Sequence, residues 1–334
     1  VPEQFTMQTQ KDLVSMHPRR GIMNIDVLSF GRMAYRVFEE TGGGNLPVLD
    51  DEGKNLILRK IAGDYEDKLR ILKGNMKKLG YISEVKSVIS EFTQYDIGEE
   101  EIEKVMESAG ESSRLYYKLG DLKILYQGFQ EYLESRYITK EELLDVLSRE
   151  VPNSEMLKNS TVVLDGFTGF TPVQNRLLLE LLKTCRKVCV TVTIDEREDP
   201  FTYRHPYQLF ALSKHMTSTL TELAKQAGIQ ILDPIRLFDM PVRRFRDNPP
   251  MAFLERNLFR YYKKDSAGKS TYQGEQKAVS LHVARNPREE AMAAAGRIRA
   301  LVRKEHYRYR EIGVIVSDMN AYGDYLKRAF DLYE

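Results

Sequence analysis

The sequence predicts an α/β fold in which a parallel sheet is interrupted by an all-helical insertion and is followed by a second α/β unit. Three observations support this prediction. Short apolar segments alternate with helical patterns in residues 1–50 and again in 151–245. Strand signals vanish between about 51 and 149, where apolar residues recur at intervals of three and four. A polar stretch with Gly and Ser, 263–277, separates these segments from two further strand–helix pairs.

The first segment is expected to alternate strand and helix. The chain opens on what resembles the tail of a strand, and a helical pattern then extends to about Met16. Ile22–Phe30 is apolar and partly alternating, which predicts a strand. A helix is expected to begin at Ser29 or Gly31 and to end at the three glycines 42–44.

After the helical insertion, strand and helix signals alternate again. Thr161–Asp165 is expected to be a strand, followed by a helix over Pro172–Thr184, where proline in the first turn is favourable. Lys187–Ile194 predicts a buried strand, Tyr207–Gln226 a helix and Ile229–Ile235 another strand. We expect these strands to share one sheet with the first segment.

The last part of the chain predicts a separate α/β unit. The polar stretch 263–277 is interpreted as a loop or linker. Val279–Ala284 and Ile312–Val316 are expected to be strands, and Pro287–Glu305 and Asn320–Phe330 helices.

The composition is that of a globular protein. Of 334 residues, 42% are hydrophobic and 30% are charged, which provides apolar side chains for more than one core. There is no apolar run of about 18 residues, so no transmembrane helix and no membrane partner are predicted. The net charge is only +1, so nucleic acid would have to be bound by a local surface. The chain begins without Met and ends inside a helical pattern, and we expect it to be a piece of a longer protein.

The two cysteines indicate a reducing, cytoplasmic environment rather than a disulfide framework. Cys185 and Cys189 lie four residues apart in a strand-like stretch without a nearby His or Cys. We therefore interpret them as buried core thiols and predict no metal site.

Asp165 stands at the end of a predicted apolar strand, before a short loop and a helix. In P-loop proteins that hydrolyse phosphate, an Asp at this place holds Mg²⁺ and the next acid positions the attacking water. The next residue here is Gly166. On its own, Asp165 could equally be a helix cap or turn former.

Longer stretches resemble known families. Asn286–Val316, NPREEAMAAAGRIRALVRKEHYRYREIGVIV, resembles the start of the second RecA-like domain of UvrD-class DNA helicases. Val1–Thr6, Val27–Val37 (VLSFGRMAYRV) and Leu164–Gln174 (LDGFTGFTPVQ) resemble the AddB, or RexB-type, family. This resemblance covers nearly the whole chain in order and is weakest across the helical insertion.

The AddB resemblance implies a domain plan. Residues 1–50 and 151–260 would form a first RecA-like domain with a truncated Walker A segment, and 51–150 its all-α insertion. Residues 261–277 would be a linker, and 278–334 the beginning of a second RecA-like domain.

The same resemblance implies a role. The parent would be one half of an ATP-dependent helicase–nuclease that processes DNA double-strand breaks, paired with an AddA-type subunit. ATP, Mg²⁺ and a 4Fe–4S cluster belong to that parent, and no cofactor is expected on this chain.

The chain departs from an active UvrD-class motor. Gly166, Thr168 and Gly169 stand where Glu, Gln and Asp are expected, so Asp165 would be a degenerate Walker B acid without its general base. The Gly-Asp-x-x-Gln pattern is missing after Thr193. The sequence at 267–271, AGKST, lacks the glycine that a P-loop requires at 263 and is interpreted as linker.

DNA contact remains as the expected activity, with no catalytic residue in this chain. Loops at the carboxyl ends of parallel strands are where α/β sheets bind ligands. Side chains on three such loops could stack bases or bond their edges; they are Gln4, Thr6, Ser29, Phe30, Arg32, Tyr35, Phe167 and Phe170. The family's capture of a Chi-type sequence in single-stranded DNA is expected there.

Other interpretations stay open. Each of these residues could instead be a packing residue, Phe30 and Tyr35 in particular. Arg243, Arg244 and Arg246 could touch phosphate or simply form a solvated face. At the level of the protein, the alternatives are an active UvrD-class helicase core and a purely structural module that binds a partner.

Overall fold

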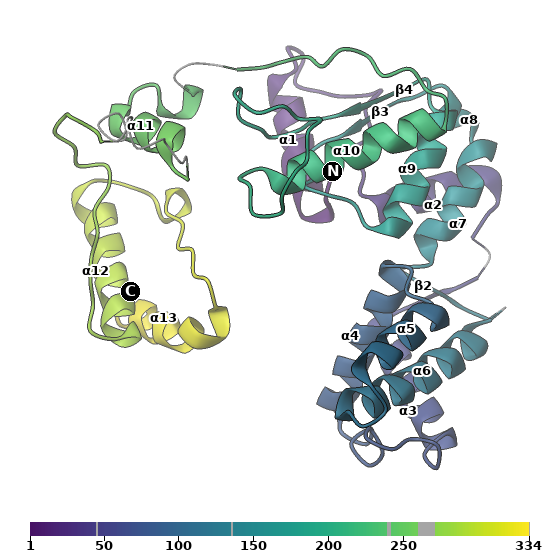
Figure 1. Cartoon of the computed structure of the whole chain (residues 1–334). Helices are drawn as coiled ribbons and strands as arrows, with labels where there is room; N and C mark the ends of the chain where they lie inside the picture. The colour runs from purple at the N-terminus through teal and green to yellow at the C-terminus, as the bar shows by residue number, and fades with distance from the viewer. Residues whose placement is uncertain (45, 135, 239–241, 260–270, 334) are drawn as a thin grey trace. The chain divides into compact units, whose positions relative to one another are not determined.

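The computed structural model describes all of the chain except residues 45, 135, 239–241, 260–270 and 334. The fold is mixed α/β and mostly helical, and its described strands form two small parallel sheets of two strands each. The chain divides into two compact units, Val1–Arg236 and Leu237–Glu334 (Figure 1). No described helix has the length and apolar character that crossing a membrane requires.

The first unit contains a mixed α/β body and a bundle of helices. Its described elements are η1 (Glu3–Phe5), α1 (Thr6–Met16), α2 (Phe30–Thr41), β1 (Val48–Leu49), α3 (Asp51–Asp64), α4 (Leu79–Gln94), α5 (Glu99–Ala109), α6 (Arg114–Leu133), β2 (Ile138–Thr139), α7 (Leu143–Glu150), η2 (Val151–Asn153), α8 (Glu155–Lys158), β3 (Thr161–Leu164), α9 (Pro172–Thr184), β4 (Lys187–Val190) and α10 (Ala211–Gln226).

The body, in which α2, α7 and α9 pack with β3 and β4, is built around the β3–α9–β4 crossover. β3 and β4 pair in parallel, with Thr161 opposite Lys187 and Leu164 opposite Val190. α9 begins at Pro172 because the Thr171 hydroxyl and the Gln174 side chain form a capping box with the backbone. The inner faces of α2, α7 and α9 bury one apolar core, which includes Val37, Leu147, Leu177 and Leu181. The core therefore joins segments that lie on both sides of the helical bundle in the sequence.

The boundaries of α2 follow from its two caps. The Ser29 side chain accepts a hydrogen bond from the Arg32 amide at the start of the helix. At the other end, Gly42 adopts a left-handed conformation with φ +74°, which glycine adopts at little cost. Both ends lie where the sequence predicts them.

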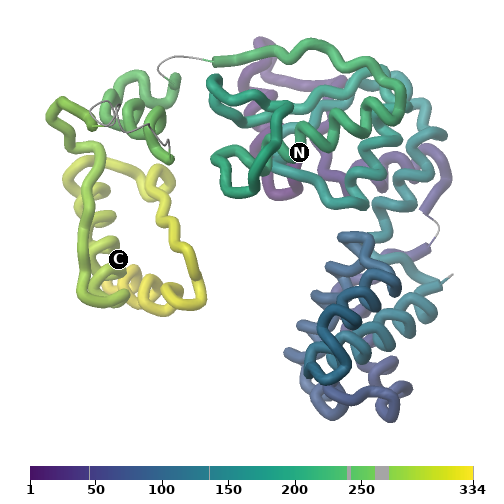
Figure 2. The backbone as a smooth tube through the Cα atoms, viewed as in Figure 1, coloured from purple at the N-terminus to yellow at the C-terminus, as the bar shows by residue number. Residues whose placement is uncertain are grey.

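Helices α3–α6 form a bundle with a separate core. Its fully buried side chains include Leu58, Ile82, Ile89 and Leu125. α6, the longest of the four, packs against α3, α4 and α5. The chain passes between body and bundle at two places, before α3 and at β2 (Figure 2).

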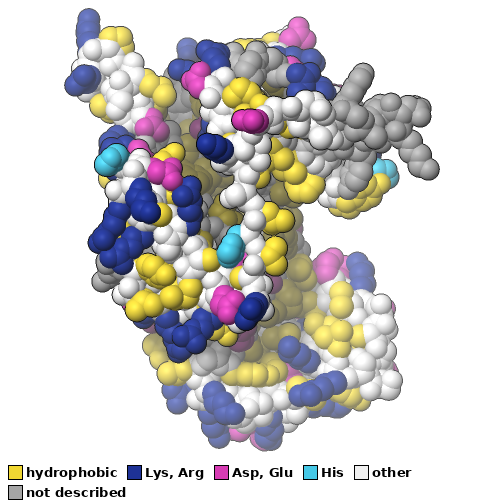
Figure 3. All heavy atoms as spheres, turned by 90° about the vertical axis from the view of Figure 1, so that its left-hand side faces the viewer, with side chains coloured by type: hydrophobic (Ala, Val, Ile, Leu, Met, Phe, Trp, Pro, Cys, Tyr) yellow, Lys and Arg dark blue, Asp and Glu magenta, His cyan; other side chains and the backbone are white. Residues whose placement is uncertain are grey.

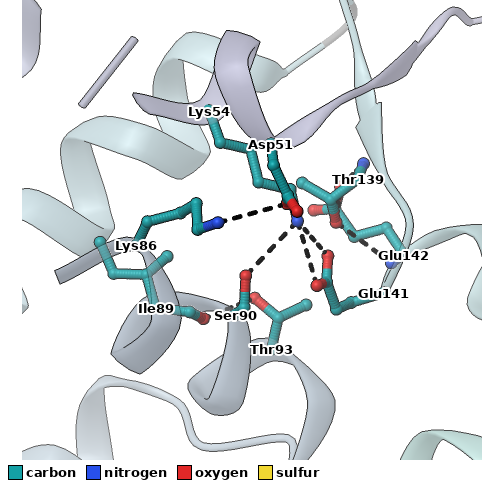
Figure 4. A network of polar contacts seen from close by, with 9 residues as sticks. All are labelled: Asp51, Lys54, Lys86, Ile89, Ser90, Thr93, Thr139, Glu141 and Glu142. Carbon is teal, nitrogen blue, oxygen red and sulfur yellow. Dashed lines mark hydrogen bonds and ion pairs between the residues drawn. The ribbon is translucent and has the colours of Figure 1, made fainter. Parts of the chain in front are cut away.

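A buried ion pair joins the bundle to the chain segment that returns to the body. The Lys54 side chain is 2% exposed, and its ammonium lies 3.0 and 2.7 Å from the two carboxylate oxygens of Glu141. It also lies 3.4 Å from the Ser90 hydroxyl of α4 (Figure 4). Nearby, Lys86 pairs with Asp51 at 3.5 Å. The network links α3 and α4 to the turn between β2 and α7.

The second unit contains short helical segments and one helix pair. Its described elements are η3 (Arg243–Phe245), α11 (Pro249–Asn257), α12 (Pro287–Lys304), η5 (Tyr309–Glu311) and α13 (Met319–Tyr333). α12 and α13 bury a small core of Ala291, Ala295, Leu326 and Ala329. Figure 3 shows one face of the whole chain, on which yellow apolar side chains are interspersed with dark-blue Lys and Arg.

Four predicted strands are wrong. Ile22–Phe30, Ile229–Ile235, Val279–Ala284 and Ile312–Val316 are irregular or extended, apart from Phe30, which begins α2. A strand requires a neighbouring strand for its backbone hydrogen bonds, and none of the described residues forms a ladder with these segments. Apolar alternation alone therefore predicted more strands than the described residues form. The predicted linker at 261–277 and the sequence at 267–271 fall largely outside the described residues.

Candidate nucleic-acid interface

The carboxyl ends of β3 and β4 bring two polar side chains together. Asp165 follows β3, and Thr191 follows β4. The Thr191 hydroxyl donates a 2.6 Å hydrogen bond to Oδ1 of Asp165. The Thr191 amide also donates to the Leu164 carbonyl at 3.0 Å, which continues the ladder. Asp165 is thus held at the edge where parallel sheets bind ligands.

The start of the chain lies against the same edge. The backbone nitrogen of Val1 lies 3.0 Å from the Leu28 carbonyl oxygen, just before α2. A Cβ placed on Gly166 would lie 3.6 Å from Cδ of Pro2. Three segments that are distant in the sequence, at residues 1–2, 28 and 165–166, therefore converge.

Three phenylalanines connect two of these segments. Phe30, at the start of α2, lies with its ring centroid 5.4 Å from that of Phe167 and 6.3 Å from that of Phe170. Phe167 and Phe170 lie 5.0 Å apart. These rings, the phenylalanine cluster, are half-buried and pack on the core of the body. Part of each ring supports the loops, and part faces solvent.

The other predicted contact residues divide into buried and exposed groups. Thr6 is buried and its hydroxyl donates to the Glu3 carbonyl, while Ser29 is buried and caps α2. Gln4 and Arg32 are at least partly exposed, and Tyr35 is 53% exposed. Thr6 and Ser29 thus have local structural hydrogen bonds, whereas the other three reach solvent.

Gly166 directly follows Asp165 in the turn after β3. Its φ is +79°, in the left-handed region that residues with a Cβ seldom adopt. A glutamate at this position would strain the turn. The backbone conformation of this turn therefore favours glycine at position 166.

The arginines and cysteines that the sequence singled out are not part of the phenylalanine cluster. Arg243 and Arg244 are exposed on η3 of the second unit. Cys185 and Cys189 are half-buried free thiols, and burial raises the pKa of Cys185 to about 11. Within the described part of the chain, no group of three or more His, Cys, Asp or Glu side chains is placed to hold a metal ion.

Thr191, the partner of Asp165, was not among the residues that the sequence indicated. A signal was present, because Thr191 lies near the end of a predicted buried strand, much as Asp165 ends the previous one. The expected strand, however, extended to Ile194, which placed this residue inside the sheet. In the structure β4 ends at Val190.

This edge combines several kinds of binding groups. The amide of Gln4 and the guanidinium of Arg32 can bond to phosphates or base edges. Tyr35, further along α2, is exposed and also lines a cavity with Phe38, Gly43 and Leu46. The half-buried aromatic rings offer surfaces for stacking.

Comparison with known proteins gives the family. A family described as ADDB, N-terminal matches residues 1–255. Three curated relatives are named as a subunit of an ATP-dependent helicase/deoxyribonuclease. That of Lachnoclostridium phytofermentans is 42% identical over 335 residues and is matched over 99% of this chain and 29% of its own length. Those of Caldanaerobacter subterraneus subsp. tengcongensis and Clostridium novyi are 33% and 30% identical, matched over 100% of this chain and 28% of their own length.

The chain spans less than a third of the length of these relatives. The family match covers the body, the helical bundle and the edge at which Asp165 lies. The sequence resemblance on residues 1–6, 27–37 and 164–174 falls within the same range, and the chain therefore belongs to the AddB family.

Proposed function

We propose that this chain is the DNA-engaging, helicase-like part of an AddB subunit in an ATP-dependent helicase–nuclease that processes double-strand breaks. In this proposal, residues 1–50 and 151–260 correspond to a first RecA-like domain and 51–150 to its insertion. Residues 278–334 begin a second RecA-like domain after the linker at 261–277. The parent pairs with an AddA-type subunit, and the parent rather than this chain provides the nuclease chemistry, ATP, Mg²⁺ and a 4Fe–4S cluster.

One observation carries the proposal. The loops before α2 and after β3 meet at the carboxyl edge of a parallel sheet, joined by the phenylalanine cluster. Arg32 and Tyr35 reach solvent from the helix that begins there. Single-strand binders combine such cations with aromatic surfaces. We infer that this edge grips unpaired DNA and takes part in scanning for a Chi-type sequence.

We also infer that the chain does not hydrolyse ATP. Water attack on a γ-phosphate requires a group that orients or deprotonates the water. The position after Asp165 is a glycine in a left-handed turn, and Asp165 itself is bonded to Thr191. Asp165 therefore remains at the end of β3, but no acid follows it to orient or deprotonate the water.

Binding of a labelled single-stranded oligonucleotide, followed by fluorescence anisotropy, tests the DNA proposal. We expect Arg32→Ala with Tyr35→Ala to weaken binding about tenfold or more, since stacking contributes about 1–3 kcal/mol per base and one phosphate contact is lost. The matched control is Arg186→Ala, because Arg186 precedes β4, at the opposite edge of the same sheet.

The control is expected to bind like the unmodified chain. Equal affinity of the Arg32/Tyr35 variant and the unmodified chain would exclude this edge as the DNA site. Stimulation of ATP turnover by DNA in the isolated chain would revive the active-helicase alternative.

A structural, partner-binding role is a second candidate, and exposed apolar side chains favour it. Leu281 is 91% exposed and Ile315 is 97% exposed. Such side chains gain free energy when another protein surface covers them. Copurification with an AddA-type subunit, without any DNA crosslink to residues 1–236, would support this role over the first.

A further inference from the structure

The helical bundle holds a row of cations over tyrosine rings. Lys60 and Arg136 both lie over the ring of Tyr132, at 5.0 and 5.1 Å from its centroid. Lys68 lies 4.8 Å from the Tyr65 centroid, which adds a further pair to the row.

Arg70 completes the row at 5.0 Å from the ring centroid of Tyr117. All four cation–π contacts found in the described part of the chain are thus on the bundle or directly after it, although the body also has exposed cations and aromatics.

These contacts follow one line, the seam between residues 60–72 and α6. The two segments run antiparallel, since Lys60 meets Tyr132 at one end and Arg70 meets Tyr117 at the other. Between them, Gly128 lets the ring of Tyr65 approach closely, because a Cβ there would lie 2.9 Å from that ring. Tyr117 and Tyr132 are 15 residues apart, or about 22 Å along a helix at 1.5 Å per residue.

The cations of the seam are exposed and have no carboxylate partner among the described ion pairs. Other lysines of the same bundle do: Lys73 pairs with Asp67, Lys77 with Glu66 and Lys104 with Glu101. A cation over a ring stays charged and keeps its outer side open to an anion. A row of such cations fits a polyanion better than a single small ion.

A cavity of about 310 Å³ opens at the Arg70 end of the seam. Tyr116, Tyr117 and Met106 line it, together with Lys68 and Arg70. Tyr116 meets Tyr117 edge to face at 5.5 Å. Aromatic and thioether walls beside two cations suit a flat base whose phosphate is held at the rim.

Two acids also line this cavity. Asp121 is 2% exposed and its carboxylate accepts hydrogen bonds from the amides of Arg70, Ile71 and Leu72. That carboxylate is therefore occupied by the backbone. Glu111 is exposed at the edge, where water screens its repulsion of a phosphate.

We propose that the seam is a second DNA site, which binds the phosphates of a single strand along its cations and one unstacked base in the cavity. The inference rests on the proposed function, because it assumes that the subunit handles unpaired DNA. It adds a surface on the bundle that is separate from the β3–β4 edge.

The test measures binding of the whole chain to a labelled oligo-dT of about 16 nucleotides across a salt series. The seam variant replaces Lys60, Lys68, Arg70 and Arg136 by Gln. We expect its affinity at about 0.1 M salt to fall at least tenfold. The salt slope should decrease by about 3, which is four phosphates at about 0.7 each.

The matched control replaces Lys73, Lys77, Lys78 and Lys104, four exposed lysines that make none of the described cation–π contacts, by Gln. It removes the same charge and is expected to retain the affinity of the unmodified chain within about threefold. Circular dichroism melting of both variants identifies any loss of folding. If seam and control variants lose affinity equally, general charge explains the effect and the seam proposal fails.

A duplex of the same length and the Arg32/Tyr35 variant separate the remaining outcomes. In the Arg32/Tyr35 variant, where the seam is the remaining proposed site, weaker binding to the duplex than to the single strand supports the cavity as a base pocket, and equal binding overturns that part of the proposal. Loss of binding in the Arg32/Tyr35 variant but not in the seam variant rejects the seam and leaves the proposed function standing. The reverse result rejects the β3–β4 edge and supports the seam.

Discussion

Asp121 shows how one side chain can organise a turn. Its carboxylate lies beneath residues 70–72 and accepts four hydrogen bonds of 2.7–3.0 Å from their backbone amides. Buried amides need partners because unpaired ones retain their desolvation cost. A single acid on α6 therefore fixes the loop that carries Arg70.

We expect Asp121→Ala to lower the free energy of unfolding by about 2–3 kcal/mol, since it leaves buried amide groups without acceptors. Urea denaturation monitored by circular dichroism measures the loss. The control is Asp67→Ala in the same loop, where the carboxylate is fully exposed and pairs only with Lys73 among the described ion pairs. That variant should change stability by less than about 0.5 kcal/mol. Equal effects of the two substitutions would show that the buried hydrogen bonds do not stabilise the fold.

Cys185 offers a prediction that depends on pH. Burial raises the pKa of its thiol from 9.0 to about 11. The folded protein therefore favours the protonated thiol, and this contribution to stability is present in full below the unfolded pKa of 9.0. It is lost as pH rises from there to the folded pKa, where the unfolded chain has already released the proton.

At about pH 8, native Cys185 should react with iodoacetamide at least about tenfold more slowly than in urea, because the thiolate is the nucleophile. Mass spectrometry of the Cys185 peptide after timed quenching measures both rates. Raising the pH to about 10 should accelerate the native reaction, which distinguishes a raised pKa from simple inaccessibility. A native rate equal to the unfolded rate at the lower pH would contradict the burial of this thiol.

At the scale of the element, local signals located the helices well. α9 begins and ends where the sequence predicts, because its start depends on Thr171, Pro172 and Gln174, which are neighbours in the chain. α2 is likewise defined by Ser29 and Gly42. The predicted strands were less reliable, because each needs a partner strand that can lie far away in the sequence.

The attachment of the bundle was not predictable, because it depends on Lys54 and Glu141, which are 87 residues apart. Nothing around either residue in the sequence distinguishes it from a solvated charge. Folding buries the ammonium and provides two carboxylate oxygens and the Ser90 hydroxyl as partners (Figure 4).

Breaking this pair should be costly. We expect Lys54→Ala to lower the free energy of unfolding by about 3 kcal/mol, since it leaves Glu141 without its partner in a partly buried place. The double substitution Lys54→Met with Glu141→Met should recover most of the loss, because no charge remains without a partner. Lys104→Ala, which removes an exposed partner of Glu101, is the control and should cost under about 1 kcal/mol. A double variant no more stable than the single one would contradict a charge-based explanation.

At the scale of the whole molecule, the two units differ in how much they bury. The first has two extensive apolar cores, one in the body and one in the bundle. The described core of the second consists of three alanines and one leucine from α12 and α13. Local opening requires less free energy where fewer apolar contacts are lost.

We therefore expect amide hydrogen exchange to be faster in α12 and α13 than in α6 and α9. Mass spectrometry of peptides from these helices, over seconds to hours at one pH, measures the protection. The peptide over Ile312–Val316 should exchange fastest of all, since its amides form no ladder with described residues. Protection of α12 equal to that of α9 would contradict this ranking.

The sequence by itself determined the mixed α/β class, the helical insertion, the boundaries of α2 and α9 and, through its resemblance, the family. These depend on capping residues, on apolar periodicity and on motifs that are continuous in the chain. Only the tertiary structure decided which apolar segments become strands, which acid meets Thr191 and which cations remain over tyrosines instead of pairing with carboxylates. Each of these depends on contacts between residues that only folding brings together.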